Sequence, residues 1–166
     1  MAAVLAVGVA MASGCNPGDV VEEDVDAGEP PDAALPRADA AVACDQPVAQ
    51  VADGHHLAGM PCQGCHAAGT GPQFTLAGTL YDARSGGSGV AGATIHIVDA
   101  NGVPDTIVTG TLGNFYSIKA YAYPIRVVGS RCPDTQAMAA SVPAPGDCNS
   151  AGCHTITTTN GRVHLP

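Results

Sequence analysis

The clearest pattern in the 166-residue chain is a series of short segments in which apolar and polar residues alternate. Residues 74–81 (FTLAGTLY) and 93–98 (ATIHIV) show it best, and Ala93, Ile95 and Ile97 share one face of the second segment. Similar short runs occupy residues 105–112, 114–122 and 124–130, with Gly-rich or Asn-Gly turns between runs. A period of two is typical of β-strands. The sequence therefore predicts a mainly β fold, with a small antiparallel β-sandwich at residues 73–130.

The rest of the chain lacks this period and divides by composition. We assign residues 1–15 to an apolar leader, 16–43 to an acidic linker, and 44–72 and 131–166 to irregular segments that flank the sandwich. The net charge is −9, and eight of the 15 acidic residues lie in the linker. Such a block predicts a flexible, solvated tether. No basic patch is present, which argues against nucleic acid as a partner.

The leader, MAAVLAVGVAMASGC, is too short to span a bilayer as a helix. It fits the apolar region of a secretory signal with small residues before the cleavage site. The ending ASGC resembles the lipobox of bacterial lipoproteins, which implies lipid on Cys15, export and a membrane anchor. Asn16, where Asp would signal inner-membrane retention in that family, favours the outer membrane, on its periplasmic or cell-surface side. An ordinary signal peptide with an incidental Cys is the alternative.

The predicted strands also carry a family resemblance. Its residues are Gly78, the Gly92-Ala93 step before a strand, the turn Asp99 to Gly102, and Gly113-Asn114-Phe115. Over residues 73–129 this order resembles the carboxypeptidase regulatory-like domains, which are transthyretin-like β-sandwiches. The resemblance implies a scaffold or binding module and no catalytic residue.

Residues 62–66, CQGCH, have the spacing of a c-type haem attachment sequence. One helical turn places two such thiols on the same side, where they reach the two vinyl groups on one porphyrin edge, and the adjacent His ligates the iron. A zinc site and a redox-active disulfide are the alternatives. A zinc site needs four ligands, and cysteine thiols of exported proteins are usually oxidised, which argues against zinc. We therefore expect Cys62 and Cys65 to carry haem c and His66 to be its proximal ligand.

Residues 148–154, CNSAGCH, end in the same way but have four residues between the cysteines. Variant c-type sites have this spacing, so the resemblance implies a second haem on Cys148 and Cys153 with His154 as its proximal ligand. The intervening residues are small and turn-prone, which suits a loop that keeps the two sulfurs near one edge of the ring. A Cys148–Cys153 disulfide with a surface His154 is the alternative.

Each iron has a sixth position, and ligation by two His would suit electron transfer because no position stays open for a substrate. The candidate distal ligands are His55, His56 and His164. His96 lies in the middle of a predicted strand, where a structural role is favoured. Met60 and Met138 are alternative ligands in type, but Met60 is too near Cys62 to reach round the ring and Met138 is favoured as a core residue. The remaining Cys44 and Cys132 favour a disulfide in an exported chain, which would tie the two flanking segments together.

These observations predict an exported, lipid-anchored c-type cytochrome with two haems, and they favour electron transfer between redox proteins over an enzymatic activity. The sandwich would bring the haem segments together, and the haems would supply apolar bulk to a chain with only four Tyr, two Phe and no Trp. A surface β-sandwich that binds a partner or serves a structural role, with disulfides and no haem, is the main alternative. A protein with one haem and an open iron that binds a gas or peroxide is another.

Overall fold

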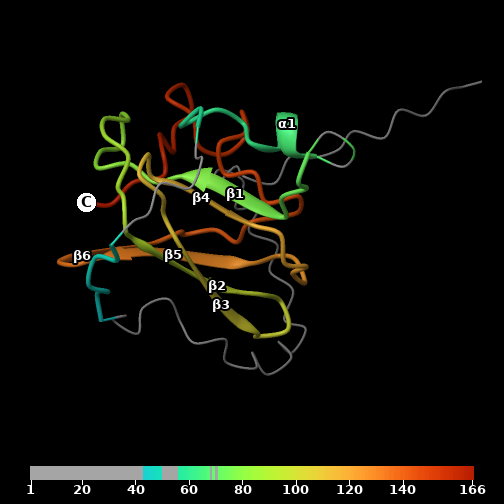
Figure 1. Ribbon diagram of the computed structural model, residues 1–166, viewed down its shortest axis with the longest axis horizontal. Coiled ribbons are helices and arrows are strands. Elements are labelled where there is room, and N and C mark those ends of the chain that lie inside the picture. Colours follow the sequence, from blue (N-terminus) through green and yellow to red (C-terminus); the bar gives the residue numbers. More distant parts are fainter. Residues whose placement is uncertain (1–42, 50–55, 68, 70) are drawn as a thin grey trace, which may run out of the picture.

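A computed structural model describes residues 43–49, 56–67, 69 and 71–166. Cys15, His55 and almost all of the acidic linker lie outside this part of the chain. The described residues form six strands in two antiparallel sheets and one short helix, so the prediction of a mainly β fold with a small antiparallel sandwich is confirmed (Figure 1). No helix among these residues has the length and apolar character needed to cross a membrane.

The smaller sheet pairs β1 (Leu76–Thr79) with β4 (Asn114–Ser117). The larger sheet has four strands in the order β3 (Pro104–Val108), β2 (Thr94–Val98), β5 (Arg126–Arg131) and β6 (Asp134–Ala137). The helix α1 (Gln63–His66) and the C-terminal segment lie on the same side of the molecule, beside the smaller sheet (Figure 1). The two segments that carry the Cys-His sequences therefore lie close together.

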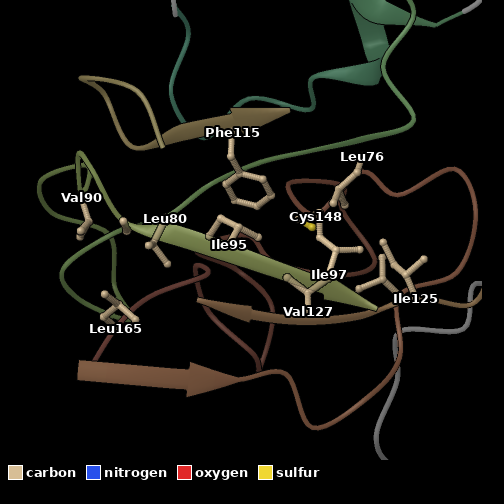
Figure 2. Close-up of a cluster of buried hydrophobic side chains, with 12 residues drawn as sticks. Leu76, Leu80, Val90, Ile95, Ile97, Phe115, Ile125, Val127, Cys148 and Leu165 are labelled. Atoms are coloured by element: carbon tan, nitrogen blue, oxygen red, sulfur yellow. The ribbon is translucent and has the colours of Figure 1, made fainter. Parts of the chain in front are cut away.

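The core lies between the two sheets. The alternation predicted for residues 93–98 is present in β2, where Ile95 and Ile97 are 0% and 1% exposed while His96 and Val98 are half-buried. Phe115 of β4 points from the smaller sheet toward these isoleucines (Figure 2). With only two Phe in the chain, aliphatic side chains supply most of this core.

Strand β1 is buried on both faces, since all four of its residues, Leu-Ala-Gly-Thr, are buried. Leu76 belongs to the core, and Thr79, also 0% exposed, contacts Gly59 and Asn149. Residues 146–148 run along the edge of β1, since the Ala77 amide donates to the Gly146 carbonyl and the Cys148 amide donates to the Ala77 carbonyl, each at 2.9 Å. Segments from both ends of the described chain therefore cover β1.

The segment 131–166, expected to be irregular, contributes directly to the sandwich. Strand β6 pairs with β5 from Arg131↔Asp134 to Val128↔Ala137, an edge strand that the sequence pattern did not predict. Val142, Cys148 and Leu165 belong to the core cluster and are 2–4% exposed. The sandwich therefore extends beyond the segments in which apolar and polar residues alternate, because its last strand, β6, is defined by hydrogen bonding to β5 and not by an alternating sequence.

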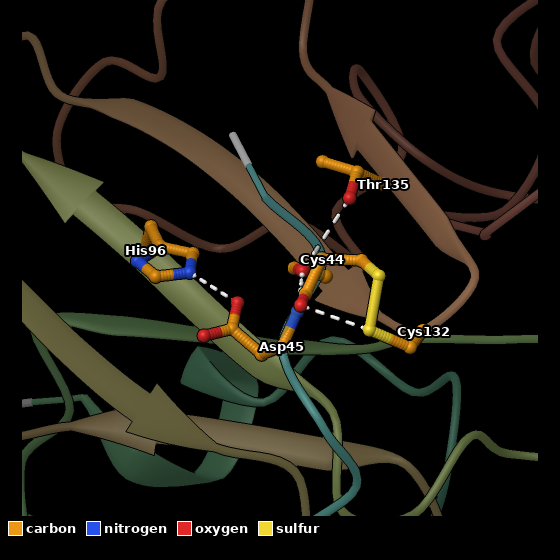
Figure 3. Close-up of a disulfide and its surroundings, with 6 residues drawn as sticks. Cys44, Asp45, His96, Cys132 and Thr135 are labelled. Atoms are coloured by element: carbon orange, nitrogen blue, oxygen red, sulfur yellow. Dashed lines mark hydrogen bonds and ion pairs between the residues drawn. A yellow bond between two sulfur atoms is a disulfide. The ribbon is translucent and has the colours of Figure 1, made fainter. Parts of the chain in front are cut away.

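A disulfide joins Cys44 to Cys132 across 88 positions of sequence, which is the pairing that the cysteine count favoured (Figure 3). Next to it, the Cys132 amide donates to the Asp45 carbonyl at 2.8 Å, and His96 Nε2 lies 2.6 Å from the Asp45 carboxylate. The hydrogen bond with His96 holds the pKa of Asp45 below its usual value. The segment before the sandwich is therefore tied to the β5–β6 turn, and His96 has a structural partner there.

Gly78→Ala should destabilise the fold, because a Cβ at position 78 would lie 2.6 Å from Phe115 Cζ and 2.9 Å from Cys148 Cβ. Relieving such overlap in a packed core costs about 1–3 kcal/mol. Gly129→Ala is the matched control, since its Cβ would meet Leu80, Leu165 and Ile95 at 3.5–3.8 Å, which is ordinary contact. Denaturant unfolding of the two variants measures the difference. Equal stability of both would contradict the close packing of β1 against residue 148.

Candidate haem-binding sites

The first Cys-His sequence forms a single helical turn. Cys62 is the N-cap residue of α1, and the amides of Cys65 and His66 donate to the Cys62 carbonyl at 3.2 Å and 2.9 Å. Both cysteines of this turn are thiols. The Cys62 side chain is half-buried and the Cys65 side chain is exposed. The helical turn expected from the spacing of the two cysteines is therefore present.

The His66 ring is held in one orientation. Its Nδ1 lies 3.1 Å from the Pro72 carbonyl oxygen, so Nε2 is the nitrogen left to bind a metal. Phe74 stacks on the ring with centroids 4.0 Å apart and planes 10° apart, and Tyr116 stacks on Phe74 at 4.4 Å. A hydrogen bond from the second ring nitrogen to a carbonyl is typical of metal-ligating His, because it fixes the tautomer and the ring direction.

A cavity of about 250 Å³ lies beside this turn. Its lining includes both thiols, the His66 ring and a second imidazole, that of His56. The two ring centroids are 6.1 Å apart and their planes are inclined by 49°. Leu57 and Met60 also line the cavity and are 64% and 56% exposed, so one wall is open to solvent.

The second Cys-His sequence absorbs its two extra residues in a loop. The His154 amide donates to the Cys148 carbonyl at 3.1 Å, the equivalent of the bond between His66 and Cys62, while the Cys153 amide donates to the Ser150 carbonyl at 3.0 Å. Residues 149–152 therefore loop out without separating the His from the first Cys. The longer spacing is thus compatible with the local arrangement found at the first site.

The sulfurs of the second site differ from those of the first. Cys148 is a thiol, 2% exposed, within the core cluster, whereas Cys153 is disulfide-bonded. Because Cys148 is a thiol, the two are not bonded to each other, and the alternative of a Cys148–Cys153 disulfide is wrong for this structure. Thioether formation at Cys153 would first require its disulfide to be reduced.

A cavity of about 490 Å³ extends from the core to this second site. Cys148, Cys153, His154, Met138 and His164 line it together with core side chains. Nδ1 of His154 lies 3.1 Å from the Gly161 carbonyl oxygen, and Nδ1 of His164 lies 2.9 Å from that of Arg162. Burial lowers the pKa of His154; the hydrogen bond with the Gly161 carbonyl opposes this shift, and the charge of His164 adds to it, so the site favours the neutral ring that can bind a metal.

The two sites contact each other through Asp147 and Asn149. The Asp147 carboxylate accepts hydrogen bonds from the Gln63 and Asn149 amides, each at 3.2 Å, and burial raises its pKa. The Asn149 side chain donates to the Met60 carbonyl at 3.1 Å. No signal in the sequence pointed to these contacts, because a turn-prone loop is expected to be solvated, whereas Asn149 is 1% exposed.

Alkylation of protein made without haem should separate the thiols of Cys62, Cys65 and Cys148. Cys65 is exposed and should react first. Burial raises the pKa of Cys62 to about 11, with a smaller contribution from the Asp147 charge, so its labelling should rise about tenfold per pH unit between pH 7 and 10. Burial raises the pKa of Cys148 to about 12, and this thiol should stay unlabelled in the folded protein. Peptide mass spectrometry after iodoacetamide, with a denatured control, measures the order. Equally fast labelling of Cys148 and Cys65 would contradict it.

Comparisons with protein-family models, with curated proteins and with solved structures found no match to this chain. Within the residues that the structure describes, no three His, Cys, Asp or Glu side chains are grouped so that they could hold a metal ion directly. A haem iron needs at most two protein ligands, because the porphyrin supplies the other four. Any functional conclusion therefore rests on the geometry of the two Cys-His sites.

Proposed function

We propose that the chain is an exported c-type cytochrome with two haems, which carries single electrons between redox proteins. One observation carries the proposal: each Cys-His sequence lies at its own cavity, where the ring of its His is fixed through Nδ1 by a backbone carbonyl. In each cavity a second His ring is present, His56 in the first and His164 in the second. Four imidazoles in two pairs suit two irons.

The residues of the first site fit a covalent haem. Cys62 and Cys65 would form the two thioethers, and His66 Nε2 would bind the iron, while Phe74 holds the His66 ring in place. Bound there, the haem supplies an iron that alternates between two oxidation states and so stores one electron. The protein provides attachment, orientation of the axial ligand and a partly open wall toward solvent.

The His residues and the apolar lining of the second site also fit a haem. His154 and His164 line the larger cavity, whose walls are the core side chains of the sandwich. Cys148 and Cys153 also line it, so both could form thioethers once Cys153 is reduced. A haem in this cavity would take up the apolar volume that the aromatic-poor core leaves.

Electron transfer fits these sites better than catalysis does. If two His bind each iron, no coordination position remains for a substrate, and the protein only accepts and releases electrons. The lipid anchor at Cys15 and the acidic tether at residues 16–43 are part of the proposal and follow from the sequence. They would let the domain reach redox partners while it stays at the outer membrane.

The alternative is a surface β-sandwich that binds a partner or serves a structural role and carries no haem. The disulfide between Cys44 and Cys132 and the disulfide-bonded state of Cys153 favour it, because both are typical of an oxidised exported domain. On that alternative the Cys62 and Cys65 thiols would have no cofactor to hold, and the His56 and His66 rings would have no shared ligand. The same experiment decides between the two functions.

Three double variants, made in a host that attaches c-type haem, test the proposal. Cys62→Ala/Cys65→Ala and Cys148→Ala/Cys153→Ala should each retain half the haem absorbance per protein, because each removes one attachment site. Cys44→Ala/Cys132→Ala is the matched control: it should retain all the haem and lose about 2–5 kcal/mol of stability. The visible spectrum and haem staining of a denaturing gel measure the outcome. Colourless parent protein would contradict the proposal and favour the alternative.

A further inference from the structure

We propose that His56 is the second axial ligand of the first haem, and that Thr79, Asn114 and Asn149 position it. We call these three side chains the polar cluster. The inference rests on the proposed function, because it needs a haem at Cys62 and Cys65. It adds that Asn149, a residue inside the second Cys-His sequence, helps to build the first site.

The distance between the two imidazoles supports His56 as the ligand. Two rings that bind one metal from opposite sides have centroids about 6 Å apart, because each metal–nitrogen bond is about 2 Å long and each ring centre lies about 1 Å beyond. The His56 and His66 centroids are 6.1 Å apart, and both rings line the same cavity as the two thiols. His66 already has Nδ1 at the Pro72 carbonyl, so its Nε2 is left for the metal.

The polar cluster is centred on the hydroxyl of Thr79, which is completely buried in β1. This hydroxyl donates to Asn114 Oδ1 at 2.6 Å. It accepts hydrogen bonds from the Gly59 amide at 2.9 Å and from Asn149 Nδ2 at 3.1 Å. Polar groups buried this deeply are costly unless they are paired, so the cluster specifies one arrangement of the segments that contribute to it.

The cluster holds the segment 56–60 along its backbone. Asn114 Nδ2 donates to the His56 carbonyl at 2.8 Å, and Asn149 Nδ2 donates to the Met60 carbonyl at 3.1 Å. Both backbone polar groups of Gly59 are hydrogen-bonded. Its amide donates to the Thr79 hydroxyl, and its carbonyl accepts a hydrogen bond from Arg162 Nη1 at 2.7 Å. A segment fixed at these points presents the His56 ring to the cavity.

Asn149 links the two sites. Its Nδ2 lies 3.9 Å from Cys62 Sγ, and its Oδ1 is a buried atom without a hydrogen-bond partner among the described residues. An incompletely paired amide, 1% exposed, costs stability, which favours a positioning role over a purely structural one. The longer second sequence thus provides a residue that the first site uses. Asn149 and Asn114 are positioning residues, because they act through the backbone of residues 56–60.

Carbon monoxide binding to the reduced, haem-loaded full chain tests His56. His56→Ala should bind one more carbon monoxide per protein than the parent, because the first iron loses its sixth ligand. Met60→Ala is the matched control, since Met60 lines the same cavity, and it should bind no more than the parent. No additional carbon monoxide in His56→Ala, or an additional one in Met60→Ala, would overturn the assignment.

A pair of Thr79 variants tests the polar cluster. Thr79→Val keeps the shape of the side chain but removes the hydroxyl, and should allow carbon monoxide to bind at the first site. Thr79→Ser keeps the hydroxyl and should behave as the parent does. Circular dichroism checks that both are folded, and the spin state of the iron reports the ligand independently of stability. A folded Thr79→Val that stays low-spin and binds no extra carbon monoxide would overturn the role of the cluster.

Haem content measured on each preparation distinguishes a failure of the ligand assignment from a failure of the proposed function. Full haem content with unchanged carbon monoxide binding in His56→Ala defeats the ligand assignment and leaves the proposed function standing. Parent protein without covalent haem at Cys62 and Cys65 defeats the proposed function, and the ligand assignment with it.

Discussion

The burial of Thr79 on the face of β1 that points away from the core is the constraint on which the arrangement of the two sites depends. Its hydroxyl is 0% exposed and must find partners within the protein. Those partners are Asn114 of the neighbouring strand, Gly59 before the first Cys-His turn and Asn149 after Cys148. One hydroxyl therefore brings together two segments separated by the whole sandwich, and residues 146–148 complete the contact along the edge of β1.

The two sites share a local pattern but differ in environment. In both, the amide of the His donates to the carbonyl of the first Cys, and Nδ1 of the His lies at a backbone carbonyl. The first site has an exposed Cys65 and aromatic rings stacked behind His66, whereas the second opens into the core and buries Cys148. On the proposed function, two haems in such different surroundings would have different reduction potentials, since burial and hydrogen bonding set them.

The sequence predicted those parts of the fold that depend on local pattern. Alternation predicted β2, and the spacing of Cys62, Cys65 and His66 predicted the helical turn that the structure contains. Strand β6 was missed, because its DTQA sequence has no apolar alternation and only pairing with β5 defines it. The burial of Asn149 was missed for a related reason: a small, turn-prone loop predicts solvent exposure, and only contacts with Thr79 and Met60, distant in sequence, reverse that expectation.

The central claim is that one small sandwich carries two covalent haems. The intact mass of the mature protein, measured under denaturing and reducing conditions after expression with c-type haem attachment, tests it most directly. Denaturation removes any haem that is only adsorbed, and reduction opens every disulfide, so only thioether-bound haem adds to the mass of the mature, lipid-carrying chain. The account predicts the mass of the chain with two haem groups. A mass equal to the chain alone, or to the chain with a single haem, would contradict it.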